Sequence, residues 1–328
     1  MAQPLKEQLL QMLIDHRDSY LSGQKISEAL GCSRTAVWKQ IAELKKEGYE
    51  VEGLQKRGYK LMTKPDNLRP HDIRVGLTTS FIGQTIIYRE SLPSTQLLAR
   101  KLANDHAEEG PIVVCEEQTA GKARLGRKWN SPKGEGIWLS LILRPNILPH
   151  KAPQLTLLTA VSVVDGIKNT TGIVCQIKWP NDILINGKKV VGILTELQAE
   201  ADRVQSVISG FGINVNTKTF PPELASIATS LALENEGVDI ERARLLQNIL
   251  QRFEVLYNEY LAKGFRAIKP LWEEHATGLG KIITARTLSG NITGYAKGIT
   301  NDGTLLIEDN EGKIHKIYSA DIEIPFQS

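Results

Sequence analysis

The first 64 residues carry the apolar periodicity of three short helices followed by two short strands. The first helix is expected around Leu9 and Leu13, and Ser22 and Ser33 stand where the second and third helices would take their N-caps. Gly31 lies where the second helix should end. The apolar positions of the third helix recur at i, i+4 and i+7, at Val37, Ile41 and Leu44. Two short capped helices joined by a three-residue connection are typical of a helix-turn-helix.

Two strand-like stretches, 49–51 and 59–61, flank a glycine-bounded turn and predict a wing. We therefore expect residues 1–64 to form a winged helix-turn-helix DNA-binding domain. This segment has 11 Lys and Arg against 8 Asp and Glu, whereas the rest of the chain is balanced. For Trp38 we weigh contact with the DNA groove against partly buried packing. The candidate DNA contacts are Arg34, Thr35, Lys39, Lys56 and Arg57, with solvated turn charge as the alternative for the last two.

The stretch Lys64-Pro65-Asp66-Asn67 breaks this pattern and predicts the boundary to a central domain, residues 65–270. Asn186-Gly187 predicts a two-residue hairpin turn. Amphipathic helices are expected at 94–107, 153–169 and 240–261, and strands at 85–90, 111–118, 137–144, 172–179, 182–185, 190–197 and 204–215. Short connections late in this domain predict a mixed, largely antiparallel sheet with helices on one face.

The tail, residues 271–328, is rich in short strand-like runs separated by turn residues. Strands are expected at 281–287, 292–299, 304–308 and 313–324. This pattern predicts a small SH3-like β-barrel. The chain as a whole is therefore predicted to be an α+β multidomain protein.

The composition limits the cellular compartment and the kinds of chemistry that we expect for the chain. At 328 residues the chain exceeds one core of typical size, and no apolar run approaches the length of a membrane span. The first residues are interrupted by charges and do not form a signal peptide. The three cysteines and six histidines show no metal-ligand spacing. We expect a cytoplasmic enzyme with reduced thiols and no membrane partner.

A cationic loop gives the first indication of chemistry. Residues 119–129, TAGKARLGRKW, set Lys122, Arg124, Arg127 and Lys128 among glycines, with almost no apolar side chain as an anchor. Such a segment cannot offset its ordering entropy by burial, so we expect it to stay mobile until an anion binds. The alternative is a solvated surface loop.

A second polar cluster follows at Lys178-Trp179-Pro180-Asn181-Asp182, after a predicted strand. Lys178 supplies a point charge for phosphate, Asn181 can both donate and accept, and Asp182 could hold a magnesium ion. An ordinary exposed turn is the alternative, since Pro-Asn-Asp is common turn chemistry. No Walker-type phosphate loop is present, so any ATP must be bound by another architecture.

Together with three further blocks, these motifs resemble the biotin protein ligases, and more narrowly the bifunctional biotin ligase and biotin operon repressor. The further blocks are Ser94-Thr95-Gln96, Lys189-Val190-Val191-Gly192-Ile193-Leu194 and Gly210-Phe211-Gly212-Ile213-Asn214, and Glu117-Gln118-Thr119 leads into the cationic loop. The likeness spans essentially the whole chain. One departure lies in the loop, where Gly121-Lys122-Ala123-Arg124 replaces the usual Gly-Arg-Gly-Arg of the family.

The resemblance implies a class II synthetase-like central domain and a two-step reaction. Biotin and ATP, with Mg²⁺, would form biotinyl-5′-AMP, and biotin would pass to a lysine of a biotin carboxyl-carrier domain. Arg124 and Lys189 would be catalytic, and Asp182 would be the metal ligand. Biotin-binding residues would be Ser94, Thr95, Gln96, Gln118, Lys122, Ala123, Arg124, Lys189 and Gly192. Adenylate- or ATP-binding residues would be Lys122, Arg124, Arg127, Trp129, Lys178, Asn181 and Asn214.

The same resemblance implies a ligand-linked homodimer that binds operator DNA with biotinyl-AMP as corepressor. Two rival functions stay open from the sequence. A lipoate-protein ligase would use similar adenylation chemistry, and a non-enzymatic metabolite-sensing repressor would explain residues 1–64 alone. Biotin-dependent exchange of pyrophosphate into ATP separates these possibilities.

Overall fold

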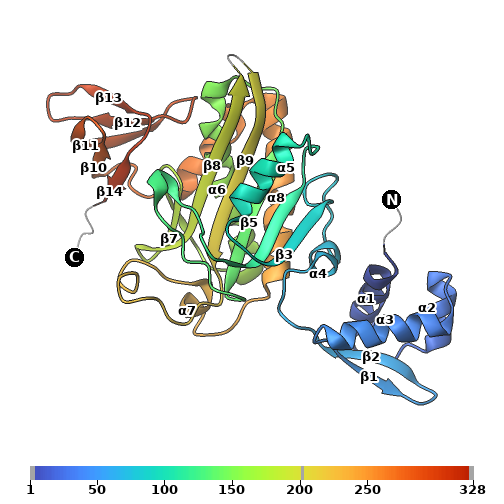
Figure 1. Cartoon of the computed structure of the whole chain (residues 1–328). Helices are drawn as coiled ribbons and strands as arrows, with labels where there is room; N and C mark the ends of the chain where they lie inside the picture. Colours follow the sequence, from blue (N-terminus) through green and yellow to red (C-terminus); the bar gives the residue numbers. More distant parts are fainter. Residues whose placement is uncertain (1–3, 201–202, 325–328) are drawn as a thin grey trace. The chain divides into compact units, whose positions relative to one another are not determined.

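A computed structural model describes residues 4–200 and 203–324 and divides the chain into two compact units, Met1–Leu77 and Thr78–Ser328 (Figure 1). The proposed division into 1–64, 65–270 and 271–328 remains a prediction. No helix among the described residues has the length and apolarity needed to cross a bilayer.

The first unit is a winged helix-turn-helix built from α1 (Leu5–Asp15), α2 (Gly23–Leu30) and α3 (Arg34–Lys46). Both predicted caps are present: Ser22 Oγ accepts from the Lys25 N–H at 3.1 Å, and Ser33 Oγ accepts from the Ala36 N–H at 3.1 Å. Gly31 ends α2 with φ 61°, a left-handed conformation that glycine adopts without strain. The core includes Val37, Ile41 and Leu44, as the periodicity predicts.

The wing is the antiparallel hairpin of β1 (Glu50–Leu54) and β2 (Gly58–Thr63). After an irregular stretch, α4 (Pro70–Arg74) packs against α1 and completes this unit. Arg74 Nη1 donates to Glu7 Oε1 at 2.5 Å, and the Tyr49 hydroxyl donates to the buried Asp72 carboxylate. The unit therefore extends past the Lys64–Asn67 break to Leu77.

The second unit contains a seven-stranded sheet in the order β3-β4-β5-β9-β8-β7-β6, in which only β3 and β4 are parallel. Its strands are β3 (Ile86–Leu92), β4 (Ile112–Gln118), β5 (Gly136–Leu143), β6 (Gln176–Lys178), β7 (Asp182–Ile185), β8 (Lys188–Glu200) and β9 (Arg203–Asn214). Asn186 and Gly187 form the predicted hairpin turn, with φ of 49° and 79°. The mixed, largely antiparallel sheet is confirmed.

The expectation of helices on one face is wrong. α6 (Pro153–Thr171) covers one face, where Thr159 Oγ1 and Ser209 Oγ lie 2.8 Å apart, and α8 (Arg242–Lys263) packs on α6. α5 (Thr95–Asn104) lies on the opposite face, where Gln96 Oε1 accepts from Ser140 Oγ at 2.9 Å (Figure 1). Successive side chains of a strand point to opposite faces of the sheet, so Ser209 of β9 and Ser140 of β5 can lie on different faces. The remaining helices of the unit are α7 (Leu231–Glu234) and α9 (Lys269–His275).

Two predicted strands differ from the structure. Gly172, expected to begin a strand, instead ends α6 with φ 76°, and the strand is limited to β6. The predicted strand 313–324 is two strands, β13 (Ile314–Ile317) and β14 (Asp321–Glu323). With β10 (Ile282–Thr287), β11 (Gly290–Ile299) and β12 (Leu305–Glu308) they form an antiparallel sheet in the order β13-β12-β11-β10-β14. The last strand therefore pairs with the first strand of the tail.

Candidate functional site

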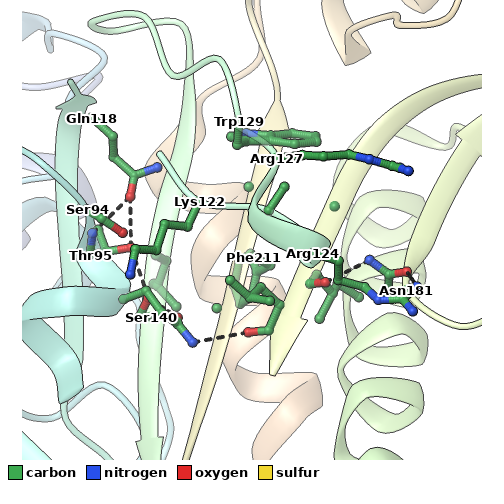
Figure 2. A pocket seen from close by; sticks show the side chains of 18 of the residues that line it. Ser94, Thr95, Gln118, Lys122, Arg124, Arg127, Trp129, Ser140, Asn181 and Phe211 are labelled. Carbon is green, nitrogen blue, oxygen red and sulfur yellow. Dashed lines mark hydrogen bonds between the residues drawn. The ribbon is translucent and has the colours of Figure 1, made fainter. Parts of the chain in front are cut away.

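A pocket opens on the α5 face of the large sheet, between the N-terminus of α5 and the cationic loop (Figure 2). It gathers most of the residues predicted from sequence. The predicted residues that line it are Ser94, Thr95, Gln96, Gln118, Lys122, Ala123, Arg124, Arg127, Trp129, Asn181, Asp182, Lys189 and Gly192. These residues are distant in sequence, and the fold brings them to one place.

The end of the pocket near α5 is lined by hydrogen-bonded polar side chains, and the Lys122 side chain extends toward them (Figure 2). Thr95 N–H donates to Gln118 Oε1 at 2.9 Å, and Thr95 Oγ1 lies 2.9 Å from Ser140 Oγ. Ser94 occupies the N-cap position of α5, yet its side chain makes no capping bond. Among the described residues its buried Oγ has no hydrogen-bond partner. A buried hydroxyl without a partner at the pocket wall suits a ligand that can hydrogen-bond to it.

The floor of the pocket is made of glycines on β8 and β9. A Cβ atom on Gly212 would lie 2.3 Å from Trp129 Nε1, and one on Gly192 would lie 2.8 Å from Trp129 Cζ3. A Cβ on Gly210 would lie 2.4 Å from Gln96 Oε1. The indole can lie against the sheet only because these positions lack side chains.

The cationic loop is folded back on itself in the structure. Ala123 N–H donates to Arg127 O at 2.9 Å, and Trp129 N–H donates to Gly121 O at 2.9 Å. The turn between them holds Leu125 at φ 57° with its side chain exposed. These few bonds hold a loop with little apolar burial, and its ordering by a ligand remains a prediction.

Arg124 and Arg127 lie at the other end of the pocket from Ser94 and Gln118 (Figure 2), and Lys189 is a third cation in the lining. Arg124 Nη1 donates to Asn181 Oδ1 at 2.8 Å, and its Nη2 donates to Ser319 Oγ at 2.9 Å. The remaining two are paired with carboxylates: Arg127 Nη2 with Asp321 Oδ2 at 2.6 Å, and Lys189 Nζ with Asp182 Oδ1 at 2.6 Å.

Two further contacts describe this charged end. Lys189 Nζ also lies 5.2 Å from the centroid of the Trp129 ring, within the range of a cation–π contact. Partial burial opposes ionisation of Asp321, but the hydrogen bond and charge of Arg127 outweigh it and lower the pKa of Asp321. The pocket thus has a hydrogen-bonding end beside α5 and an end lined by arginines, as suits a ligand with a polar ring and an anionic tail.

Two predicted residues do not line the pocket. Asn214 is buried at the end of β9, where its side-chain amide donates to Thr229 O at 3.1 Å. Lys178 lies in β6 and contributes to the lowered pKa of Asp321 through its charge. Contact between either residue and an adenylate remains a prediction.

The residues do not fit a resident metal site. The described residues hold no group of three or more His, Cys, Asp or Glu side chains that could bind a metal ion. The candidate ligand Asp182 instead pairs with Lys189. Its role as a magnesium ligand therefore remains a prediction from resemblance.

Sequence reasoning missed several lining residues. Ser140 joins the hydrogen bonds beside α5, and Asp321 comes from the C-terminal sheet. Ser319, in the bend before Asp321, does not line the pocket but accepts a hydrogen bond from Arg124. The alternation of Gly210 and Gly212 along β9 is a signal that could have found the floor. No local pattern indicates a partner nearly 200 residues away, as Ser319 is from Arg124.

The predicted DNA contacts lie on one groove of the first unit or beside it. Arg34, Thr35 and Lys56 line the groove between α3 and the wing. Lys39 is exposed on α3, and Arg57 follows Lys56 in the wing turn. Arg57 Cζ and Lys60 Nζ lie 5.7 Å and 5.9 Å from the centroid of the Tyr20 ring.

Comparison with known proteins identifies the class. Residues 87–214 match the Biotin/lipoate A/B protein ligase family, residues 6–60 match the HTH domain, and residues 278–324 match the Biotin protein ligase C terminal domain. The first of these contains most of the pocket and the second contains the groove. The fold and the site therefore define a biotin/lipoate-type protein ligase that carries a helix-turn-helix domain.

Similarity along the full chain is closer still. The chain is 55% identical over 326 residues to the bifunctional ligase/repressor BirA of Bacillus subtilis, covering 99% of this chain and 100% of that protein. It is 25% identical over 294 residues to the bifunctional ligase/repressor BirA of Escherichia coli, covering 88% of each. The biotin protein ligase from Aquifex aeolicus, solved in complex with biotin and ATP, superposes with a TM-score of 0.64 at 32% identity, covering 73% of this chain and 98% of that one. The chain belongs to the family of bifunctional biotin ligases and repressors.

Proposed function

We propose that the protein is an ATP-dependent biotin protein ligase and a DNA-binding repressor. It forms biotinyl-5′-AMP from biotin and ATP and transfers biotin to a lysine of a biotin carboxyl-carrier domain. The observation that carries this proposal is the two-ended pocket, in which Arg124 lies at the opposite end from Ser94 and Gln118 (Figure 2) and Lys189 lines the pocket paired with Asp182.

The hydrogen-bonding end of the pocket suits the ring of biotin. The ureido group of biotin both donates and accepts hydrogen bonds, and the Ser94 hydroxyl lacks a partner among the described residues. Thr95 and Gln118 are fixed by their mutual bond and by Ser140, so the binding surface is preorganised. A bound ring then directs the carboxylate tail toward the cations.

The cationic end suits the first chemical step. The biotin carboxylate attacks the α-phosphate of ATP, the bond to pyrophosphate breaks, and pyrophosphate leaves. The carboxylate is already ionised at neutral pH, so no general base is required. Two anions must instead be held together, and we assign this task to Arg124 and Lys189, with Lys122 and Arg127 assisting. Mg²⁺ accompanies ATP as part of the substrate, and no step is assigned to a protein-bound metal.

In the second step the amine of the acceptor lysine attacks the acyl carbon of the adenylate, an amide bond forms as the amine loses a proton, and AMP leaves. The positive charges that bind the adenylate also stabilise the departing phosphate. The nucleophile comes from the carrier domain, so no nucleophilic side chain of this chain takes part.

The first unit supplies the repressor function. In our proposal biotinyl-AMP orders the 121–128 loop, which favours a homodimer that presents two α3 helices to a palindromic operator. Biotinyl-AMP is then both intermediate and corepressor. A cytoplasmic location completes the proposal and agrees with three unpaired cysteines.

Isotope exchange between pyrophosphate and ATP tests the ligase function. We expect exchange to depend on biotin and to fall by about 10²–10³-fold in Arg124→Gly and Lys189→Ala, the usual effect of removing one charge-stabilising group. Arg89→Gly is the matched control because Arg89 is exposed and its side chain donates to the carbonyl of the adjacent Tyr88. Exchange that depends on lipoate would select the lipoate ligase instead, and no exchange with either acid would leave the repressor alone.

A further inference from the structure

Trp38 is exposed on the helix that should enter DNA, although exposure of an indole gives the fold no stability. Its exposed fraction is 60%, whereas its neighbours Val37 and Ile41 are 1% and 3% exposed. Within α3, which the structure describes throughout, it is the large hydrophobic side chain left in solvent. Trp38 is therefore mostly exposed and does not belong to the core of the unit.

The position of Trp38 places it in the groove rather than beside it. Arg34 lies four residues before it and Thr35 three, so all three share one face of α3. It is the fifth residue of α3, within the N-terminal part that contacts base edges in helix-turn-helix proteins. Leu54, Gln55 and Lys56 of the wing line the same groove as these residues of α3.

The charge of the groove selects DNA as the occupant. Its lining residues, all of them described, include Arg34 and Lys56 but no Asp or Glu. The helix itself carries four Lys and Arg against one Glu. A cationic groove with an apolar centre fits a ligand that is anionic at its edges and has apolar groups inside, as the major groove has.

We propose that Trp38 reads thymine through its C5-methyl group. The base edges in the major groove present hydrogen-bond donors and acceptors, and the thymine methyl is the apolar group among them. An indole directed into that groove therefore gains most at A·T pairs. This inference rests on the proposed repressor function and adds what the repressor recognises.

The test uses the full-length protein with biotin and ATP and a duplex selected by it from a random-sequence pool. Each thymine in the selected half-sites is replaced in turn by deoxyuridine, which removes only the methyl. For the unaltered protein we expect one or two positions per half-site at which affinity falls about three- to fivefold, the worth of one buried methyl-sized group. For Trp38→Ala we expect weaker binding that is the same for thymine and deoxyuridine at those positions, and for Trp38→Phe a partial methyl effect.

Lys56→Ala is the control, because a phosphate contact should weaken binding to all duplexes and leave the methyl effect in place. Hydrogen exchange of the α1 amides, measured on the same samples, shows that the first unit of each variant is folded. The inference is overturned if Trp38→Ala binds as tightly as the unaltered protein, or if it keeps the full loss at the same deoxyuridine positions. If the unaltered protein selects no preferred duplex, the repressor function itself fails and the inference fails with it.

Discussion

At the scale of single residues, the glycines of β8 and β9 decide where the Trp129 indole can lie. Gly192 and Gly212 face each other across the strand pair, and the ring lies over both. The indole in turn lies within reach of the Lys189 ammonium. The missing side chains of these two glycines therefore allow the position of an aromatic ring that lies beside a cation we assign to catalysis.

Gly212→Ala tests this dependence. The added Cβ would lie 2.3 Å from Trp129 Nε1, so the indole must move away from the sheet. Overpacking of this kind costs about 1–3 kcal/mol, and we expect the KM for ATP in pyrophosphate exchange to rise about tenfold or more. Gly53→Ala is the control, since its Cβ would meet Tyr59 at an ordinary 3.5 Å. An unchanged KM for both substrates would contradict the placement of Trp129 beside the nucleotide.

Two adjacent buried residues of α4 should make the stability of the first unit depend on pH in opposite senses. Burial raises the pKa of Asp72 to about 7 from 3.8, despite the hydrogen bond from Tyr49. Burial lowers the pKa of His71 to about 4 from 6.5, although Glu47 opposes this. The other charged groups that act on the pair are Lys6, Lys64, Arg69 and Arg74.

The signs follow from which state binds the proton. Between pH 3.8 and 7 folded Asp72 keeps a proton that the unfolded chain has lost, so its contribution falls as pH rises. Between pH 4 and 6.5 unfolded His71 binds a proton that the folded chain does not, so its contribution rises with pH. We expect the two slopes to oppose each other in the unaltered protein. Asp72→Asn should leave stability that rises from pH 4 to 6.5, and His71→Gln should leave stability that falls from pH 4 to 7.

Hydrogen exchange of the α1 amides in the full chain, corrected for the intrinsic pH dependence of exchange, measures this stability. The same pH slope in both variants would show that neither group titrates as burial requires.

At the scale of elements, the cationic loop is tied to the C-terminal sheet. Arg127 pairs with Asp321 of β14, and Arg124 donates to Ser319 just before it. The side chains of Arg127 and Asp321 are 65% and 39% exposed, so the pair is worth about 0–1 kcal/mol. The loop is thus held weakly enough for a ligand to rearrange it.

The rate of trypsin cleavage after Arg124 and Arg127 measures how firmly the loop is held. Without ligands, Asp321→Asn should speed cleavage by at most a few fold, because an exposed ion pair is lost. With biotin and ATP, cleavage of the unaltered protein should slow strongly as the loop orders on the adenylate. Glu323→Gln is the control, since Glu323 lies in the same strand but pairs with Arg286. Equal cleavage with and without ligands would contradict ligand-induced ordering.

Local elements could be predicted where their cause is local. α8 has an apolar face at Leu245, Ile249 and Phe253, and the turn at Asn186 follows from the backbone preferences of two residues. The strand expected from Gly172 could not be predicted correctly, because an apolar run after a long helix does not reveal a left-handed helix end. Which face of the sheet α5 covers depends on the residues that the neighbouring strands and helices bury. The apolar periodicity within α5 does not predict that face.

The site divides in the same way. Arg124, Lys189 and Asn181 belong to contiguous motifs, so the sequence alone brings them to attention. Ser319 and Asp321 reach the loop only because β14 pairs with β10 at the edge of the C-terminal sheet. Such contacts arise from tertiary structure, and single-sequence patterns do not contain them.

At the scale of the whole molecule, the two compact units suggest that ligation and DNA binding can be separated. All residues that line the pocket lie after Thr78, and all groove residues lie before Leu77. The fragment 78–328 should therefore retain biotin-dependent pyrophosphate exchange and carrier biotinylation while losing operator binding.

The place of the cut matters for this prediction. A fragment 65–328 would keep α4 but lose Glu7 and Tyr49, the partners of Arg74 and Asp72, together with the core on which α4 packs. Leaving a buried carboxylate and apolar surface uncovered favours aggregation, so 65–328 should be recovered in lower yield and aggregate on storage, whereas 78–328 should not. Light scattering compares the aggregation of the two fragments. Exchange activity, expressed per active site as counted from pyrophosphate release, compares their catalysis. Loss of exchange in a folded, monodisperse 78–328 fragment would show that the DNA-binding unit takes part in catalysis, and the separation of functions would then be wrong.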